Sequence, residues 1–263
     1  MIDIHTHLLF DIDDGSKSLE ISLDQIGIME RAGVTDIFLT PHYIRNSFPT
    51  NKKTIQERYV VLVDELKKND INVNLHKAAE VYLEDDIHND IEAENLTVND
   101  TDYVLVETSM NGFPENLYDN LFHLVRKGYK PIMAHPERYL DVNTDIDYAE
   151  NLLHRNVYLQ VNAGSFLGTF GDRAEKAAWQ LLENGWVHFI ASDNHCLSQD
   201  FILPEALKLV SKKIGEEAVE LFTVTNQQKV LNNESIEFFQ FKQDNIDQKK
   251  IPFFQRFIDR ILR

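Results

Sequence analysis

Histidine and carboxylate side chains recur in this sequence directly after short apolar runs. The first example is His5-Thr6-His7, which follows the apolar segment 1–4. Residues two apart in an extended segment point to the same face, so both imidazoles can reach one cation. A single His-x-His pattern is weak evidence, and a purely structural pair of histidines explains it equally well.

Further apolar runs end in the same residue types. They lead into Thr40-Pro41-His42, Ala79-Glu80, Val106-Glu107, Ala134-His135-Pro136-Glu137-Arg138 and Ser192-Asp193-Asn194-His195, and an acidic group of Asp11, Asp13 and Asp14 follows His7. Each motif alone has an ordinary explanation; Asp193, for example, could cap the following helix. Together they place His, Asp or Glu at six of seven predicted strand ends, and none of these ends offers a lysine. A structural explanation accounts poorly for this coincidence.

These residue types favour bound metal ions. A cluster of carboxylates without cations would repel itself and raise its own pKa values. Divalent ions remove the problem, because they stabilise ionised carboxylates and neutral imidazoles together. Histidine and carboxylate donors without a thiolate suit Mn, Fe or Zn in a catalytic site better than a structural zinc site. The pattern predicts two or three ions that activate water and hold the oxygens of a displacement at phosphorus or carbon.

Two arginines and the single cysteine lie close to these motifs. The guanidinium of Arg138 suits bidentate phosphate binding, and an ion pair with a neighbouring carboxylate explains it equally well. Arg45 follows His42 in a loop that could cover the site. Cys196 is excluded as a phosphatase nucleophile, because a Cys-x5-Arg loop would need arginine where Ile202 stands.

Short apolar runs alternate with helical patterns through most of the chain. The predicted strands are 1–4, 36–40, 72–78, 103–107, 131–134, 158–161 and 187–191, and the predicted helices are 18–32, 53–69, 115–127, 146–155, 172–184 and 204–214. Several of these strands lack polar alternation, as expected for parallel strands buried on both faces. A closed α/β barrel is favoured over an open sheet, because chemically active residues follow nearly every strand rather than one switch point. We therefore expect one domain over residues 1–235.

The composition is that of an acidic, soluble protein. The 263 residues are 43% hydrophobic, enough for one large core, and the net charge of −17 argues against a nucleic-acid partner. One cysteine, no signal-peptide pattern and no apolar run of about 20 residues predict a cytoplasmic location. Residues 236–263 are predicted to form a polar linker and a short basic amphipathic tail. This tail is expected to pack on the domain, and docking to a membrane surface or a partner is the alternative.

The motifs, in their order and spacing over residues 1–235, resemble the polymerase and histidinol phosphatase (PHP) superfamily. Within it, Asp13-Asp14-Gly15 and His135-Pro136-Glu137-Arg138 are similar to the bacterial protein-tyrosine phosphatases of capsular and exopolysaccharide synthesis. The resemblance implies a single-domain distorted (β/α)7 barrel with three divalent ions, usually Mn, with Fe or Zn as alternatives. It also implies that the substrate is phosphotyrosine on the C-terminal tail of a bacterial tyrosine kinase.

Carried over residue by residue, the resemblance implies three groups of ligands. The first ion would be held by His5, His7, Glu80 and Asp193, the second by Glu80, Glu107 and His135 with Glu80 bridging, and the third by His42, His195 and Asp14, with Asp13 as the alternative to Asp14. The residues implied to act in catalysis are Arg138, Asp193 and His195, and Arg138 would bind the phosphoryl group. The chain departs from the family pattern at Asp200, in a stretch where these phosphatases carry a second arginine. Arg45 could compensate for that loss.

Three other functions stay open as alternatives. A small-molecule phosphatase of the histidinol phosphate type would use the same site. An amidohydrolase-like enzyme would need a lysine at a mid-barrel strand end, where the sequence pattern offers none. A regulatory module that keeps a metal site for stability is disfavoured by the complete ligand set and by Arg138. The residues therefore predict a metal-dependent hydrolase, and the resemblance predicts phosphotyrosine as its substrate.

Overall fold

Parallel strands form the centre of the computed structural model, which describes residues 1–48 and 50–238. One sheet has the order β1-β2-β4 and consists of β1 (Ile2–Thr6), β2 (Asp36–Leu39) and β4 (Asn74–Lys77). The other has the order β3-β5-β6-β7-β8-β9 and consists of β3 (His42–Tyr43), β5 (Glu80–Tyr82), β6 (Tyr103–Glu107), β7 (Lys130–Ala134), β8 (Tyr158–Asn162) and β9 (Phe189–Ala191). All pairings within both sheets are parallel, as the alternation of strands and helices predicts.

The two sheets are joined where two strands continue after a break. β3 continues the path of β2 beyond Pro41, and β5 continues the path of β4. Proline has no N–H to donate, so a regular ladder is interrupted at this position. Backbone bonds nevertheless cross the break: Ala78 N donates to Leu39 O at 3.0 Å, and Glu80 N donates to Pro41 O at 3.0 Å.

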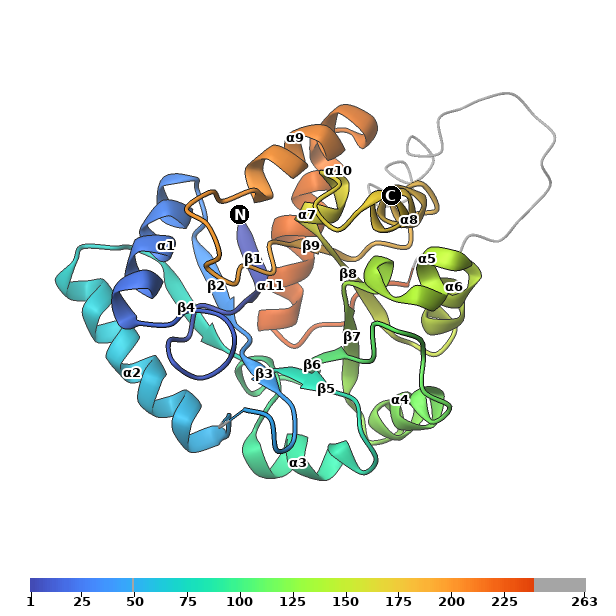
Figure 1. The fold of residues 1–263 in the computed structure, drawn as a ribbon, viewed down its shortest axis with the longest axis horizontal. Helices are drawn as coiled ribbons and strands as arrows, with labels where there is room; N and C mark the ends of the chain where they lie inside the picture. The colour runs from blue at the N-terminus through green and yellow to red at the C-terminus, as the bar shows by residue number, and fades with distance from the viewer. Residues whose placement is uncertain (49, 239–263) are drawn as a thin grey trace.

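The ring is completed between β9 and β1. Asp193 N donates to His5 O at 3.0 Å, and His7 N donates to Asn194 O at 2.9 Å. The strands of the described residues thus follow seven paths around one centre (Figure 1). This arrangement confirms the predicted α/β fold with parallel strands, and it fits a distorted (β/α)7 barrel in which isolated backbone bonds join the two sheets.

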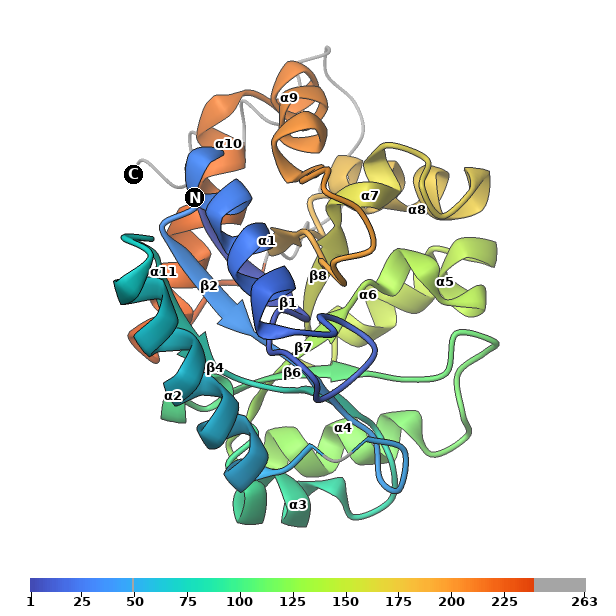
Figure 2. The same ribbon diagram turned by 60° about the vertical axis from the view of Figure 1, so that its left-hand side comes forward.

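Helices surround this ring, as Figures 1 and 2 show. In chain order they are α1 (Leu19–Arg31), α2 (Lys52–Lys68), α3 (Ile87–Glu94), α4 (Leu117–Arg126), α5 (Leu140–Thr144), α6 (Asp147–Leu153), α7 (Ala163–Phe166), α8 (Asp172–Glu183), α9 (Leu203–Ile214), α10 (Glu216–Glu220) and α11 (Asn226–Leu231), with single turns η1 (Val98–Asp100) and η2 (Pro136–Arg138) and the π-helical η3 (Leu221–Thr225). Local capping explains two of the starts. Ser18 accepts from the Ile21 N–H before α1, and Asn51 forms a capping box with Thr54 before α2. No helix among the described residues is both long and apolar enough to cross a membrane.

Apolar side chains form two cores, one on each side of the strands. The inner core fills the barrel and includes Ile2, Ile4, Phe38, Tyr103, Leu105, Ile132, Phe189 and Ala191. The outer core lies between the strands and the helices, and it takes the intervening positions Val104, Val106, Met133 and Ile190. Because both faces of the strands are buried, the strands carry continuous apolar runs, as the sequence pattern predicts.

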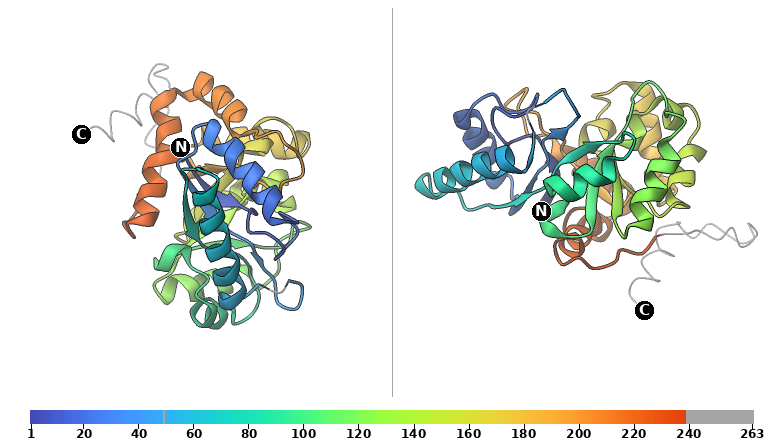
Figure 3. Two further views of the ribbon diagram at one scale, coloured as in Figure 1. Left: turned by 90° about the vertical axis from the view of Figure 1, so that its left-hand side faces the viewer. Right: turned by 90° about the horizontal axis from the view of Figure 1, so that it is seen from below.

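The barrel is closed at the N-terminal ends of its strands. Figure 3 (left) shows α10, η3 and α11 on one side of the molecule and the loop after β1 on the other. Tyr158 donates its hydroxyl to Ile236 O at 3.0 Å and stacks on Phe238, with ring centroids 4.3 Å apart. Residues 236–238 of the predicted linker therefore pack under the barrel. The predicted basic tail falls in residues 239–263, outside the described part of the chain.

Most predicted elements occur within a few residues of their expected positions. The sequence pattern did not predict the short strands β3 and β5 as separate elements, and it placed His42 and Glu80 at strand ends. In the structure each of these residues begins a short strand after a break in the ladder. The helices α3, α5, α7, α10 and α11 were also not predicted, because each has eight residues or fewer and little periodicity to detect.

Candidate metal centre

A β-bulge in β1 points two histidines into the top of the barrel. Asp3 pairs with Ile37, but Thr6 pairs with Leu39, so β1 uses three steps where β2 uses two. A one-residue shift moves the following side chains to the opposite face. His5 therefore joins the barrel interior, although its neighbour Ile4 also packs there.

The first group of converging atoms surrounds the imidazoles of β1. His5 Nε2 lies 3.2 Å from His7 Nε2, 3.1 Å from Glu80 Oε2 and 3.3 Å from Asp193 Oδ1. His7 Nε2 lies 3.2 Å and 3.4 Å from the same two oxygens. All of these side chains are almost fully buried. Metal bonds of about 2.1 Å place adjacent ligand atoms about 3 Å apart, which matches this spacing.

A second group forms around the same Glu80 carboxylate. His42 Nδ1 lies 3.0 Å from Glu80 Oε2 and 2.9 Å from Glu107 Oε1. The other oxygen of Glu80, Oε1, lies 2.9 Å from His135 Nε2. Glu80 thus presents oxygens to both groups, in the position of a bridging carboxylate.

A third group lies closer to solvent. Atoms of His7, Asp14, His42 and His195 all lie within 4.8 Å of one another. Asp14 Oδ1 is 3.5 Å from Nε2 of both His42 and His195, and the Asp14 side chain is 57% exposed. His7 stacks on His195, with centroids 3.9 Å apart. His42 belongs to the second and the third group, because its two ring nitrogens face opposite ways.

Several buried atoms at this centre have no hydrogen-bond partner among the described residues. They are Oε2 of Glu80, Oε1 of Glu107, Oδ1 of Asp193 and Nδ1 of His42. Buried polar atoms without partners are rare, since each costs free energy. Here they face one another, with oxygens and imidazole nitrogens in turn, as the ligands of a cation do. The donor set therefore fits divalent metal ions.

The charges at the centre depend on one another. Burial alone would raise the pKa of Glu80, but His5, His135 and His42 outweigh it and hold that pKa well below its usual value. Burial likewise opposes a charge on His42, but Glu107 and Glu80 raise its pKa to about 10. Protonated imidazoles can therefore neutralise the carboxylates. Divalent ions that bind here must displace those protons, which couples metal affinity to pH.

Residues behind the ligand atoms fix the orientation of the histidine rings. His5 Nδ1 lies 2.7 Å from Gln160 Oε1, and His7 Nδ1 lies 2.7 Å from Asp13 Oδ2. A proton on Nδ1 leaves Nε2 of each ring free to accept a cation, which is the usual arrangement of metal-ligating histidines. Gln160 comes from β8, the one predicted strand without a terminal His, Asp or Glu. The sequence feature that could have identified Gln160 is an amide side chain within an otherwise apolar predicted strand.

The two candidate aspartates play different parts in this geometry. Asp13 is buried, and its Oδ2 accepts from the His42 N–H at 3.0 Å while its Oδ1 accepts from the Gly15 N–H at 3.0 Å. With His7 on Oδ2 as well, both oxygens are occupied by protein donors. Asp14 instead points an oxygen toward the third group, and the His195 contact lowers its pKa to about 2.

Two ligand candidates stand on strained backbone. His135 has φ of 38° and Asp193 has φ of 53°, both in the left-handed region that non-glycine residues rarely adopt. The turn at each residue re-aims its side chain at the end of a strand. Asp193 is further held by Asn162 Nδ2, which donates to its Oδ2 at 2.7 Å. Strain of this kind is typical of functional sites.

Arg138 lies at the rim of the centre. Its Nη1 donates to Asp193 Oδ2 at 3.1 Å, and its guanidinium lies 4.2 Å from the ring centroid of Phe170. Arg45, the other predicted phosphate ligand, is bound to a carboxylate and a backbone carbonyl instead. Its Nε donates to Asp90 Oδ2 at 2.6 Å, and its Nη1 donates to the Asp85 carbonyl at 2.8 Å.

Cys196 does not have the environment of a nucleophile. Burial raises the pKa of its thiol to about 11, so the thiol stays protonated at neutral pH. A lysine does occur at a strand end, since Lys77 closes β4. Its ammonium group binds Gln56 Oε1 at 2.8 Å and lies over the Tyr59 ring, away from the histidine groups. It therefore does not supply the amidohydrolase lysine.

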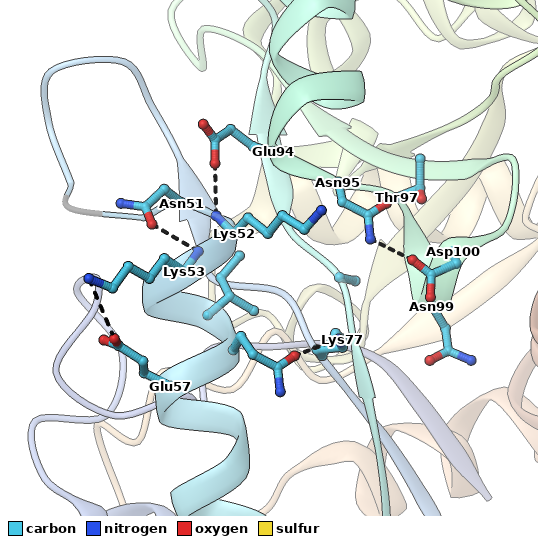
Figure 4. A pocket seen from close by; sticks show the side chains of 13 residues that line it. Asn51, Lys52, Lys53, Glu57, Lys77, Glu94, Asn95, Thr97, Asn99 and Asp100 are labelled. Atoms are coloured by element: carbon cyan, nitrogen blue, oxygen red, sulfur yellow. Dashed lines mark hydrogen bonds and ion pairs between the residues drawn. The ribbon is translucent and has the colours of Figure 1, made fainter.

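Two hollows lie on the described surface near these elements. One, of about 660 Å³, is lined by Arg138 and Phe170 and adjoins the metal centre. The other, of about 590 Å³, lies between the start of α2 and the loop after α3 (Figure 4). Among its lining residues, the Lys53 ammonium lies 3.8 Å from Glu57 Oε1, and the backbone N–H of Lys52 donates to Glu94 Oε2 at 2.9 Å. Its lining contains neither Arg138 nor any of the candidate metal ligands, so it is not the catalytic hollow.

A parallel barrel whose C-terminal strand ends gather histidines and carboxylates defines the class of metal-dependent barrel hydrolases. The chain belongs to the CpsB/CapC family of capsular polysaccharide synthesis, whose model matches residues 1–232. This confirms the resemblance that the motifs predict.

Curated relatives and a solved structure support the family membership. Tyrosine-protein phosphatase CpsB of Streptococcus agalactiae serotype III (strain NEM316) is 31% identical over 90% of this chain and all of its own length. Tyrosine-protein phosphatase YwqE of Bacillus subtilis (strain 168) is 30% identical over 90% of this chain and 93% of its own. A crystal structure from work on YwqE of Bacillus subtilis and CpsB of Streptococcus pneumoniae, described as unique metal-dependent tyrosine phosphatases, superposes with a TM-score of 0.85. It is 29% identical and covers 90% of this chain and 97% of its own.

More distant structures share only the fold. The histidinol phosphate phosphatase of Lactococcus lactis superposes with a TM-score of 0.53 at 14% identity, covering 81% of this chain and 94% of its own.

Proposed function

We propose that this protein is a metal-dependent protein-tyrosine phosphatase, a phosphoric monoester hydrolase. The observation that carries the proposal is the convergence of three histidine and carboxylate groups beneath Arg138. Membership of the CpsB/CapC family, whose curated relatives are named tyrosine-protein phosphatases, supports phosphotyrosine as the substrate. The substrate we propose is the phosphotyrosine-bearing C-terminal tail of a bacterial tyrosine kinase that controls capsule synthesis, in the cytoplasm.

The chain's own residues would hold three divalent ions, with Mn as the proposed metal. The ligand groups are His5, His7, Glu80 and Asp193 for the first, Glu80, Glu107 and His135 for the second, and Asp14, His42 and His195 for the third. Bound ions of this kind activate water and neutralise charge on the phosphoryl oxygens. The orphaned oxygens of Glu80, Glu107 and Asp193 support this assignment. Because His42 Nδ1 lies 2.9 Å from Glu107 Oε1, His42 is a further candidate ligand of the second ion.

Arg138 supplies the protein's own recognition of phosphate. Its guanidinium is held in place by Asp193 on one edge and by the face of Phe170, so little side-chain entropy is lost on binding. The remaining N–H groups can donate to two phosphoryl oxygens in the bidentate geometry that arginine favours. Asp193 contacts both Arg138 and the first ligand group, so the arginine and the metal ions can contact the same phosphoryl group. The phosphate-binding role predicted for Arg45 stays a prediction. In the structure its Nε is bound to the Asp90 carboxylate, which would compete with a phosphate for this side chain.

The alternative of a histidinol phosphate phosphatase has less support. Its structural match shares 14% identity and shows the fold alone, whereas the curated relatives at 30–31% identity are named tyrosine-protein phosphatases. The two hypotheses predict opposite substrate preferences on the same metal centre.

The test is a metal-exchange assay on defined substrates. The protein is stripped with a chelator, reloaded with Mn²⁺, and assayed on a phosphotyrosine peptide and on histidinol phosphate. We expect activity on the peptide to be lost and then restored, with the peptide preferred. His135→Ala should abolish the restored activity, whereas His123→Ala, an exposed histidine on α4, should not. Unchanged activity after chelation, or a preference for histidinol phosphate, would contradict the proposal.

A further inference from the structure

A groove is lined by Arg138, at the rim of the metal centre, and by the start of α8. It has a volume of about 660 Å³, within the range of about 300–1,000 Å³ usual for ligand pockets. Arg138 and Phe170 line the end beside the metal centre, and Arg173 in the first turn of α8 lines it as well. The start of α8 packs against the turn η2 that carries Arg138, so both arginines belong to one hollow.

The two arginines have different partners. Arg138 is bound to Asp193 and stacked on Phe170. Arg173 is exposed, and within residues 1–48 and 50–238 it forms no ion pair or hydrogen bond through its side chain. Its guanidinium therefore keeps all its donors available. Arginine left without a partner in a groove beside a phosphate site is suited to bind a second anion.

One carboxylate shares this groove, and its position does not neutralise Arg173. Asp172 is the first residue of α8, where the positive end of the helix dipole stabilises a carboxylate. Consecutive helical residues leave the helix about 100° apart, although both Asp172 and Arg173 line this groove. No ion pair joins them in the part of the chain that the structure describes.

The charge of the whole chain makes this local arginine significant. The net charge is −17, so most of the surface repels an acidic peptide. A phosphotyrosine peptide with acidic neighbours therefore needs local cations to dock. The groove supplies two arginines against one aspartate.

We propose that Arg173 is a specificity-determining residue that binds the carboxylate of an acidic residue flanking phosphotyrosine in the substrate peptide. This rests on the proposed function, because it takes the phosphoryl group to sit at Arg138. Phe170, whose ring lies against the Arg138 guanidinium and whose side chain is 40% exposed, gives the peptide an aromatic surface to pack on. Arg173 acts on binding of the peptide and not on the chemical step, so it should affect KM and leave kcat unchanged.

The experiment compares charge variants on matched peptides. Arg173→Glu is assayed with the Mn-loaded protein on phosphotyrosine peptides flanked by Glu, by Ala or by Lys, and on p-nitrophenyl phosphate. Lys176→Glu is the matched control, since it makes the same charge change on an exposed position of α8 outside the groove lining. For Arg173→Glu we expect KM for the Glu-flanked peptide to rise about threefold to tenfold, as for a partly exposed charge pair. The Lys-flanked peptide should bind more tightly to this variant, and p-nitrophenyl phosphate should be unaffected.

Three outcomes would overturn the inference. Equal loss on all peptides, or equal effects of Arg173→Glu and Lys176→Glu, would show that only overall charge or folding had changed. Unchanged KM for the Glu-flanked peptide would show that no carboxylate docks on Arg173. Absence of activity in the wild-type protein on every aryl phosphate would instead refute the proposed function, so the two failures can be told apart.

Discussion

Replacing Asp13 by asparagine should show whether Asp13 orients the metal ligand His7 or is itself a metal ligand. In the structure the two oxygens of Asp13 accept from three donors: His7 Nδ1, the His42 N–H and the Gly15 N–H. An amide has one oxygen, so at least one donor would face an NH₂ group instead. The Asp13 side chain is buried, so the lost acceptor is not replaced by bulk solvent. Asp13→Asn therefore weakens the hold on His7 without removing any atom from the ligand groups.

The expected magnitude follows from this geometry. A hydrogen bond to a charged group contributes about 1.5–3 kcal/mol. Each 1.4 kcal/mol corresponds to about a factor of ten, which agrees with the about 10- to 100-fold loss of metal affinity seen when an orienting residue is removed. We expect Asp13→Asn to raise the Kd for Mn²⁺ by that factor while a saturating metal concentration restores the bound metal. Asp14→Asn should instead reduce the metal content by about one ion per chain, because it removes a ligand of the third group.

The assay is a titration of metal-stripped protein with Mn²⁺, followed by calorimetry and by elemental analysis of the loaded protein. Asp11→Asn serves as the matched control, because Asp11 lies in the same loop with its side chain 73% exposed. If Asp13→Asn lost one ion irreversibly and Asp14→Asn resembled the control, Asp13 would be the ligand. If both resembled the control, the loop would not belong to the metal centre and the reasoning would be refuted.

Three further predictions concern other parts of the molecule. Gly15→Ala should lower kcat/KM about 100-fold, because its Cβ would lie 2.1 Å from the His7 carbonyl oxygen and a shift of about 1 Å is costly at an active site. Gly27→Ala is the control and should have little effect, because the nearest atom to its Cβ is the flexible end of a side chain at 3.3 Å. Equal effects of the two variants in kinetic assays would contradict this prediction. Cys196→Ser should keep kcat/KM within about twofold, since burial raises the thiol pKa to about 11, and a complete loss would show that the thiol acts in catalysis. Burial lowers the pKa of His188 from 6.5 to about 3, so the ring stays neutral in the folded protein. The unfolded chain binds a proton at this histidine below about pH 6.5, so the free energy of unfolding decreases as the pH falls below that value. Denaturant unfolding at about pH 7.5 and about pH 5 should show that His188→Gln removes about 2 kcal/mol of the wild-type decrease, and an unchanged decrease would be inconsistent with a neutral buried ring.

The sequence carried the types of the chemical groups and their approximate places. Ligand chemistry is local information, since imidazole and carboxylate side chains at successive strand ends suit a metal wherever the strands converge. The pairing of His5 with His7 followed from the two-residue repeat of a strand, and the structure shows their Nε2 atoms 3.2 Å apart. The α/β alternation likewise predicted the parallel ring, because apolar runs of strand length must be buried on both faces.

Other features depended on contacts between residues far apart in the chain. Gln160, which holds His5, lies 155 residues away from it, and no local pattern connects the two. The sequence left Asp13 and Asp14 open, because adjacent aspartates in a loop have the same chemistry. Only the folded loop shows that the oxygens of Asp13 are taken by protein donors while Asp14 faces His195.

The His5 and His7 pair itself shows where sequence information ended. Its residue types and spacing determined that both imidazoles share one face. Which face that is depends on the bulge between Asp3 and Thr6, which is set by pairing with β2. A shift of one residue in register turns every following side chain to the opposite side, and register is fixed by the packing of the whole barrel. The sequence thus determined what the centre is made of, and the tertiary structure decided that its parts meet.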